Sequence, residues 1–374
     1  VVAPNCLPKT AWPPTSINPT FLLTFTLLFT AVLSMVTGTS YGSAGSAGVA
    51  MMAIGNAMGL NPGMVAGAVI CGAMFGDKLS PLSDTTNLAP AVAGAKLGDH
   101  VKSMLWTTVP PMLISIVIFT VLGFTQTGEG YNPGDLNLYI DYLEGSFHIG
   151  LVTLIPAVVL IALLLLRVGA FEALGIGAVA GGVIAMLFQG ESLQSVYSVA
   201  YNGFTSDTEI AVLKAILNRG GMSSMLQYVA IITFAVGMGG MLDKLGVLDR
   251  VLSLFTKKIH SDGSLILVTM LVGYVTSIVS SSSPLSHVLT GRLMLPLFKE
   301  RHIAPRILSR CLEDSGTLAG PMIPWHGYGI YMAGTLGVAW SQYILFVPLL
   351  WLTPLFSVFY GYTGISIIHT KDEK

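Results

Sequence analysis

The sequence predicts an all-α polytopic membrane protein. Of its 374 residues, 53% are hydrophobic and only 10% are charged, whereas soluble domains carry about 25% charged residues. Apolar runs that approach the ~20 residues needed for a membrane-spanning helix recur along the chain. The alternating pattern of a transmembrane β-barrel is absent, so helices must satisfy the backbone polar groups in lipid. The 42 glycines suit close helix packing.

Composition and short motifs narrow the class of protein. The net charge of −1 argues against a nucleic-acid partner. The cysteines Cys6, Cys71 and Cys311 have no paired spacing, so we interpret them as core or incidental residues. CxxC, HExxH and P-loop motifs are absent, and we expect no bound cofactor and no ATP-driven step. The stretch GTSYG at 38–42 lacks the strand–turn–helix context of a hydrolase nucleophile, so an enzyme is not predicted.

Charged residues in the loops predict the orientation of the helices. Basic residues gather at 96–102, 257–260 and 299–310 and at Arg167, whereas the loop 127–147 carries acidic residues and no Lys or Arg. By the positive-inside rule the basic loops are cytoplasmic and 127–147 is external. Four plain helices and one external polar segment follow from this assignment: helices 103–123, 148–166, 172–189 and 225–242, and the polar segment 190–221.

The segment 264–298 is predicted to enter and leave the membrane on the same side. Basic loops flank both of its ends, and its middle reads VSSSSPLS, which is a poor helix. A re-entrant hairpin with a polar tip explains these features. The next segment, 305–340, is predicted to be one spanning helix that is unwound where the sequence reads EDSGTLAGPMIPWHG, and a last helix is expected at 342–361.

The first half of the chain repeats this plan. Residues 21–59 are apolar on both sides of TGTSYGSAG, which predicts another re-entrant hairpin, and the apolar segment 63–95 is interrupted by GDKLSPLSDTTNLAP. The two interruptions read DTTNLAP from Asp84 and DSGTLAGP from Asp314, an offset of 314 − 84 = 230. Because the loop after 63–95 is cytoplasmic, the first broken helix runs inward and the second runs outward. The halves are therefore inverted copies, which is typical of secondary transporters.

We therefore expect an inverted-repeat secondary transporter with two re-entrant hairpins and two broken transmembrane helices. The first repeat spans 21–126 and the second spans 148–366; the external loop 127–147 joins them and a cytoplasmic tail, 367–374, follows. The second repeat holds three plain helices before its hairpin and the first holds none, so about three N-terminal spans are expected to be missing. The polar, proline-rich segment 1–20, which begins with Val and shows no signal peptide, fits a truncated chain.

The polar interruptions predict a cation site at membrane depth. Unwound backbone is tolerated there only where protein or a wet cavity surrounds it. Small hard cations such as Na⁺ bind oxygen ligands, and hydroxyls, amides, carboxylates and free carbonyls supply them. The candidate ligands carry such oxygens: Thr37, Thr39, Ser40, Asp84, Thr85, Thr86 and Asn87 in the first half, and Ser281, Ser282, Asp314, Ser315 and Thr317 in the second. Among these, Asp84, Asn87 and Asp314 are the predicted Na⁺ ligands.

Acidic residues in the apolar segments are the strongest indication of a functional site. An ionisable side chain at membrane depth costs free energy, so its default interpretation is a functional one. Asp84 and Asp314 are predicted to couple the movement of ions or protons, and Asp77 and Glu313 are further candidates. The alternative for each is a position near the membrane interface or at a helix cap. Lys78 is interpreted as the permanent partner of Asp77.

Three basic residues beside the second interruption are candidate substrate contacts. Histidine titrates near neutral pH, so His287 and His326 are candidates to carry a proton or to touch a substrate. Arg292 is a candidate for meeting an anionic substrate. The alternatives are hydrogen-bonded packing histidines and an arginine that anchors the chain near the interface.

Several long motifs resemble the NhaC family of sodium/proton antiporters, which is related to dicarboxylate/sodium symporters: TGTSYGSAG, GAMFGDKLSPLSDTTNLAP, DHVKSMLWTTVPP, NRGGMSSML, LSRCLEDSGTLAGPMIPW and MAGTLGV. The resemblance covers residues 21–366. It implies a dimeric, elevator-type carrier whose mobile domain holds the hairpins and broken helices. Family members also include a Na⁺–lactate/malate antiporter and candidate amino-acid carriers. Two places depart from the family pattern. The family has a Gln after the serines of the second tip and an aliphatic residue at His287, and it has Asn, Ser or Thr at His326.

The leading hypothesis is a Na⁺/H⁺ antiporter of the bacterial cytoplasmic membrane, working as a homodimer by alternating access. Asp84 and Asp314 would bind Na⁺ or H⁺ in competition. The alternative is a Na⁺-coupled transporter or antiporter of a small organic anion, of the malate or lactate type, or of an amino acid. A channel would need a continuous pore, and a membrane enzyme would need a nucleophile motif, so both are less favoured.

Overall fold

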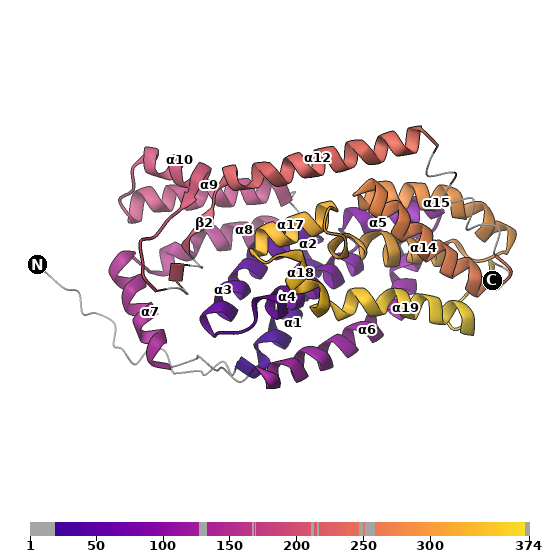
Figure 1. Ribbon diagram of the computed structural model, residues 1–374, viewed down its shortest axis with the longest axis horizontal. Coiled ribbons are helices and arrows are strands. Elements are labelled where there is room, and N and C mark those ends of the chain that lie inside the picture. Colours follow the sequence, from indigo (N-terminus) through magenta and orange to yellow (C-terminus); the bar gives the residue numbers. More distant parts are fainter. Residues whose placement is uncertain are drawn as a thin grey trace, which may run out of the picture.

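Helices make up nearly the whole of the structure (Figure 1). The computed structural model describes residues 19–126, 133–166, 168, 170–210, 213–214, 217–246, 250 and 259–370. Two short strands, β1 (Gly203–Phe204) and β2 (Arg219–Gly220), pair in antiparallel fashion. Predictions that concern residues 1–18, 127–132, Arg167, 251–258 and 371–374 lie outside the described residues. The all-α class is confirmed.

Short non-helical stretches separate several helices of the first half of the chain. Its elements are α1 (Pro19–Thr37), α2 (Ser40–Ser43), the π-helix η1 (Ala44–Gly48), α3 (Val49–Ala57), α4 (Pro62–Leu79), α5 (Asp84–Ala93) and α6 (Leu97–Thr125). The polar tip TGTSYGSAG separates α1 from α3, and both of these helices pack against α4. Helices α4 and α5 together are long and apolar enough to cross a membrane, and they meet at an angle of 48°.

Close contact between α1 and α4 depends on glycine. A Cβ atom built at Gly76 would overlap the backbone of Ala31 and Met35 in α1, and one at Gly72 would overlap the carbonyl of Leu27. Small residues of this kind allow helix backbones to approach closely where no hydrophobic driving force acts between helices in lipid. The glycines of α4 therefore set the distance between the two helices.

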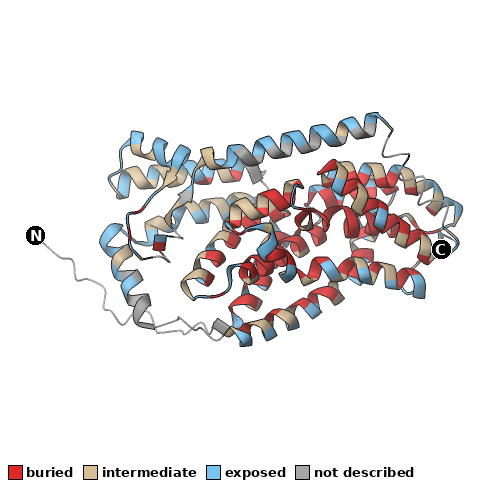
Figure 2. Ribbon diagram, viewed as in Figure 1, coloured by how far each residue is buried: buried red, intermediate tan, exposed pale blue. Residues whose placement is uncertain are grey.

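The middle of the chain forms a peripheral group of helices. Its elements are α7 (Pro133–Ser146), the 3₁₀-helix η2 (Leu151–Leu154), α8 (Ile155–Leu165), α9 (Ala170–Phe188), α10 (Leu193–Asn202) and α12 (Met222–Lys244). Figure 1 shows α9, α10 and α12 along one long side of the molecule, and Figure 2 shows that most of this group is exposed. Exposed apolar side chains such as Val179, Phe234 and Met241 suit contact with lipid.

The second half of the chain contains the other helix breaks. Its elements are α14 (Asp262–Ser280), α15 (Ser283–Glu300), α16 (Pro305–Leu312), the π-helix η3 (Glu313–Thr317), the 3₁₀-helix η4 (Gly320–Met322), α17 (Gly327–Leu336), α18 (Trp340–Tyr343), the 3₁₀-helix η5 (Ile344–Phe346) and α19 (Pro348–Thr363). Helices α14 and α15 pack against each other across a two-residue connection. The segment predicted as one helix at 342–361 is bent by 52° before α19, because Pro348 has no backbone N–H to continue the helix.

Three helices in the described part of the chain are individually long and apolar enough to cross a membrane. They are Thr20–Thr37, Leu97–Thr125 and Asp262–Ser280. The number rises to five if the α4–α5 pair and the pair formed by Trp340–Phe346 and Pro348–Thr363 each count as one span. These spans agree with the predicted polytopic membrane protein.

The buried core divides into two hydrophobic clusters. One includes residues of α1, α3, α4 and the segment from α17 to α19, and the other includes residues of α5, α14, α15 and α16. Helix α4 therefore lies in one cluster and α5 in the other, and α16 and α17 are divided in the same way. In both cases the chain passes from one cluster to the other at the polar stretch between the two helices.

Candidate functional site

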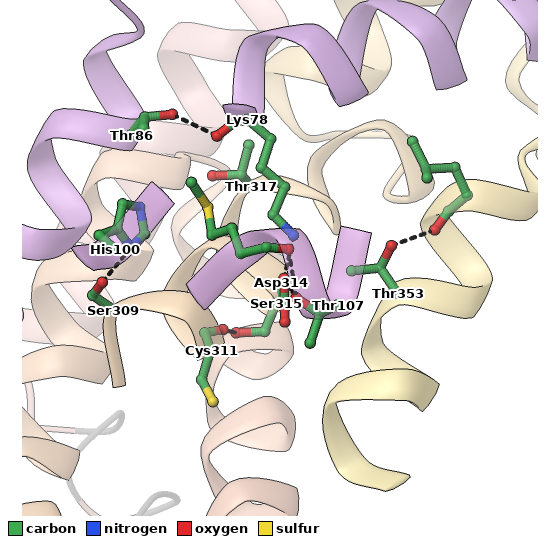
Figure 3. Close-up of polar contacts among 12 residues, drawn as sticks. Lys78, Thr86, His100, Thr107, Ser309, Cys311, Asp314, Ser315, Thr317 and Thr353 are labelled. Atoms are coloured by element: carbon green, nitrogen blue, oxygen red, sulfur yellow. Dashed lines mark hydrogen bonds and ion pairs between the residues drawn. The ribbon is translucent and has the colours of Figure 1, made fainter. Parts of the chain in front are cut away.

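The end of α4, just before the first break, meets the π-helix η3 at an ion pair. Lys78, in the last turn of α4, directs its ammonium group at Asp314 in η3, and both side chains are fully buried (Figure 3). The hydroxyl of Thr107 in α6 donates to the same oxygen of Asp314, Oδ1, at 3.2 Å. The prediction that Lys78 pairs with Asp77 is wrong, because consecutive residues of a helix do not face each other. Lys78 faces the second break instead.

The first break is closed by its own polar side chains. Pro81 disfavours the helical conformation at the residue before it, and Ser80 is extended, with ψ at 125°. The hydroxyl of Thr86 donates to the carbonyls of Asp77 and Lys78, at 3.2 Å and 3.0 Å. These two carbonyls at the end of α4 therefore share one hydroxyl partner within the protein.

Two of the predicted Na⁺ ligands lie at the exposed start of α5. Asp84 is exposed, and its Oδ1 accepts the backbone N–H of Thr85 at 2.9 Å. Asn87 is exposed as well, and its amide donates to the carbonyls of Ser83 and Pro81 at 2.6 Å and 2.9 Å. Within the described residues no contact joins either side chain to the carboxylate of the second break. The structure does not bring the predicted three-residue set together.

The first polar tip reaches the first break through one hydrogen bond. Ser40 Oγ donates to Asp77 Oδ2 at 2.6 Å, and both residues are buried. The other two ligand candidates of this tip serve the backbone: the Thr39 hydroxyl caps α2, and the Thr37 hydroxyl donates to a carbonyl one turn earlier in α1. Ser40 is thus the tip residue that contacts an acid.

The second break begins as a π-helix that carries two acids. Glu313 and Asp314 open η3, and the Ser315 hydroxyl donates to the carbonyl of Cys311 at 2.7 Å. A Cβ atom at Gly273 in α14 would overlap the Ser315 side chain, so the backbone of α14 lies directly against η3. Single-turn π-helices inside α-helices are frequent at functional sites.

The second polar tip surrounds the backbone of η3. The hydroxyls of Ser277 in α14 and Ser283 in α15 both donate to the carbonyl of Gly316, at 3.3 Å and 3.0 Å. His287 Nε2 lies 3.1 Å from the hydroxyl of Thr317, and both residues are buried. The tip between α14 and α15 is therefore held on the second break by side chains from both helices.

Unpaired carboxylate oxygens concentrate at this junction, which consists of Asp77, Lys78, Glu313 and Asp314. In the part of the chain that the structure describes, Asp77 Oδ1, Asp314 Oδ2 and both oxygens of Glu313 are buried without a hydrogen-bond partner. Glu313 directly precedes Asp314 in η3 and is fully buried. With every group ionised the formal charge is 1 − 3 = −2. Buried charge of this size needs compensation.

The remaining candidates have mixed positions. His326 is buried at the start of α17, where its Nδ1 accepts the backbone N–H of Tyr328 at 3.1 Å; its Nε2 is buried without a partner among the described residues. Arg292 is exposed on α15, which fits the alternative of an anchor near the interface. Ser281 follows α14 in the left-handed region, with φ at 55°, and Ser282 is the residue before α15.

Three residues outside the predicted site lie at the junction or beside it. Thr107 contacts Asp314, as described above, and His100 in the first turn of α6 forms a hydrogen bond with Ser309 of α16 (Figure 3). His100 and Ser309 are both fully buried. His100 and Thr107 are seven residues apart, which places them on the same face of a helix. A polar face on an otherwise apolar helix is the feature of the sequence that could have identified His100 and Thr107 as site residues.

Comparison with known families decides the class of the protein. A family model described as the Na⁺/H⁺ antiporter family matches residues 72–365, a range that includes both breaks and the second polar tip. The chain belongs to the Na⁺/H⁺ antiporter family. It is a transport family of membrane proteins, which agrees with the apolar helices and with the NhaC resemblance of the sequence motifs.

Relatives in the family differ in the substrates that their names state. The chain is 40% identical to the malate-2H⁺/Na⁺-lactate antiporter of Bacillus subtilis, over 95% of this chain and 76% of the relative. It is 36% identical to the Na⁺/H⁺ antiporter NhaC of Alkalihalophilus pseudofirmus, over 94% of this chain and 76% of that protein. It is 31% identical to the arginine/ornithine antiporter ArcD of Halobacterium salinarum, over 93% and 72%. Membership in the family therefore leaves the substrate to be argued from the site.

Proposed function

We propose that this chain exchanges Na⁺ for H⁺ across the cell membrane. The observation that carries the proposal is the buried junction, in which three carboxylates and one ammonium give a formal charge of −2. Na⁺ and H⁺ neutralise the same carboxylate oxygens, so they compete for the junction. Net charge at membrane depth is costly, and occupancy by either ion removes that cost. Na⁺ and H⁺ are the transported ions, and the proposal needs no cofactor.

Lys78 gives the exchange a second source of protons. Asp314 Oδ1 is occupied by Lys78 and Thr107, while Oδ2 is free of partners among the described residues. A Na⁺ ion that binds Asp314 competes with the Lys78 ammonium for its carboxylate. An ammonium that loses its partner in the interior is left as an uncompensated charge, and release of its proton removes that charge. Na⁺ binding would thus drive a proton out of the junction.

We propose elevator-type alternating access as the movement that carries the ions. Direct contacts join the four polar segments into one unit: Ser40 with Asp77, Lys78 with Asp314, and both arms of the second tip with the carbonyl of Gly316. Helix α4 lies in one hydrophobic cluster and α5 in the other, and α17 and α16 are divided in the same way. This division supports the inverted-repeat interpretation. We also propose a homodimer, which cross-linking of the chain in membranes would test.

A second candidate function is Na⁺-coupled transport of a small organic anion or amino acid. Two relatives are named for malate and lactate and for arginine and ornithine. His326 keeps a buried Nε2 without a partner among the described residues, at the point where α17 begins. An unpaired buried nitrogen of this kind is suited to a polar solute group. In this candidate the same carboxylate junction would bind the coupling Na⁺.

Transport in proteoliposomes distinguishes the two candidates. The purified chain is reconstituted with a pH-sensitive dye inside, and an outward or inward Na⁺ gradient is imposed. Proton movement with no organic solute present is the expected result for Na⁺/H⁺ exchange. Proton movement that requires malate, lactate or an amino acid would show the second function instead. Protein-free liposomes and Asp314→Asn liposomes serve as controls for leak.

A further inference from the structure

Arg310 is a buried cation that the junction does not balance. It lies in α16, four residues before Asp314, and its side chain is fully buried. Its Nη1 donates to the hydroxyl of Ser366 at 2.9 Å, whereas Nε and Nη2 are buried without a hydrogen-bond partner in the described part of the chain. The ion pairs among those residues do not include Arg310. Its one hydrogen-bond partner there is a neutral hydroxyl.

The unpaired nitrogens define which ligand fits. A guanidinium group stays protonated in proteins and has donors only, so a buried one needs acceptors, and the best are anionic. Nε and Nη2 share one edge of the planar group, and this edge matches the two oxygens of a carboxylate in bidentate geometry. The bond from Nη1 to Ser366 holds the other end of the group and fixes the direction in which the open edge points.

We propose that the Nε–Nη2 edge of Arg310 binds the carboxylate of an organic solute that this chain transports. The proposal rests on the second candidate function, in which the chain transports a small organic anion or amino acid. Malate, lactate, arginine and ornithine, which name two of the relatives, all carry a carboxylate. Four helical residues span about 6 Å along the axis, so a solute on Arg310 lies close enough to couple to a cation on Asp314.

A short C-terminal segment covers this arginine. The segment 364–370, here called the strap, bonds to the chain between α15 and α16: the Ala304 N–H donates to the carbonyl of Ile368, and the Thr370 N–H donates to the carbonyl of His302, both at 2.8 Å. Ser366 is in the left-handed region, with φ at 60°, which is strained for a residue other than glycine. The contact with Arg310 is thus maintained by a strained residue in a pinned segment.

A cavity lies beside the strap. It has a volume of about 530 Å³ and is lined by Gly364 and Ile367, on either side of Ser366, and by polar residues such as Asp262, Arg301 and His369. A volume of this size accommodates a small organic acid.

Ligand-induced thermal stabilisation of the purified full chain tests the proposal. The probes are L-malate, L-lactate and L-arginine, with chloride and inorganic phosphate as other anions. We expect at least one carboxylate to raise the melting temperature of the wild-type chain, because a ligand that binds the folded state stabilises it. Arg310→Gln should weaken that affinity at least tenfold, which corresponds to about 1.4 kcal/mol. Arg306→Gln, which removes a positive charge one turn earlier in the same helix, is the matched control and should retain the wild-type affinity.

A second pair of variants keeps the test valid if Arg310→Gln does not fold. Arg310→Lys keeps the charge but removes the two-donor edge, and Ser366→Ala removes the orienting bond; both should bind the carboxylate several-fold more weakly than the wild-type chain. The proposal is overturned if these variants bind the carboxylate as the wild type does. It is also overturned if Arg292→Gln, and not Arg310→Gln, loses the thermal stabilisation by carboxylate, or if chloride or phosphate stabilises the chain and carboxylates do not.

Transport without an organic solute separates this inference from the proposed function. If the wild-type chain moves protons in response to Na⁺ alone but shows no carboxylate response, the proposed exchange stands and the role of Arg310 fails. If a carboxylate binds through Arg310 and Na⁺ alone moves no protons, the site stands and plain Na⁺/H⁺ exchange fails.

Discussion

Removal of the Lys78 ammonium should destabilise the chain, because Asp314 would remain as a buried carboxylate without its counter-charge. At an ordinary ion-pair distance of about 3 Å and an effective dielectric constant of about 20, the Coulomb attraction is 332/(20 × 3), or about 5.5 kcal/mol. Desolvation offsets much of this attraction in the intact pair. A variant that lacks one partner loses the attraction but keeps the desolvation of the other ion, and such variants lose about 3–5 kcal/mol. The Thr107 hydroxyl remains as a donor to Asp314, so we expect a loss of about 3 kcal/mol for Lys78→Met.

A double-mutant cycle measures the interaction itself. Lys78→Met, Asp314→Asn and the double variant are compared by denaturant or thermal unfolding in one detergent, in the absence of Na⁺. The double variant should be more stable than the sum of the two single effects implies, by about 2 kcal/mol, since contacting charged residues couple by about 0.5–3 kcal/mol. A parallel cycle with the exposed Asp84→Asn should be additive within about 0.5 kcal/mol. Additivity of Lys78 with Asp314 would refute the buried pair.

Three further outcomes test packing and the site. Gly76→Ala should lower the free energy of unfolding by about 1–3 kcal/mol because its Cβ would overlap the backbone of α1. Gly98→Ala, where nothing lies within 4 Å of the new atom, should be close to neutral in the same thermal melts, and equal effects would argue against the glycine contact. Asp77→Asn should raise the Na⁺ concentration for half-maximal exchange at least tenfold, whereas Asp84→Asn should change it less. Na⁺ titrations of proteoliposomes measure both values, and the reverse order would show that the ion binds at α5. His287→Leu should cost about 1–2 kcal/mol by leaving a buried hydroxyl of η3 unpaired, and wild-type stability in chemical denaturation would contradict that role.

The helical membrane class could be predicted from the sequence because the signal is local. The length of an apolar run and the rarity of charge along it depend only on neighbouring residues, and they identify helices such as α6 and α14 directly. The breaks were also local features, since Pro81 and the glycine- and proline-rich stretch after Asp314 disfavour regular helix. The inverted-repeat arrangement remains a prediction that the division of the core supports.

The site could be predicted by residue type but not by pairing. Asp77, Glu313 and Asp314 were selected because acids in apolar segments are unusual, and all three are buried. Asp84 was selected for the same reason and is exposed. The difference lies in which face of each helix turns inward, and that depends on neighbours from distant parts of the chain. Thr107 was missed because a hydroxyl in an apolar helix normally bonds its own backbone.

The sequence by itself determined that the chain is a helical membrane protein with polar interruptions in otherwise apolar segments, because hydropathy and helix-breaking residues act over short distances. The tertiary structure decided which polar groups meet. It placed Lys78 against Asp314 across 236 residues of sequence. It also buried Arg310 and exposed Arg292, although both are arginines in helices of the second half. Contacts of this kind follow from the packing of whole helices, which no short stretch of sequence encodes.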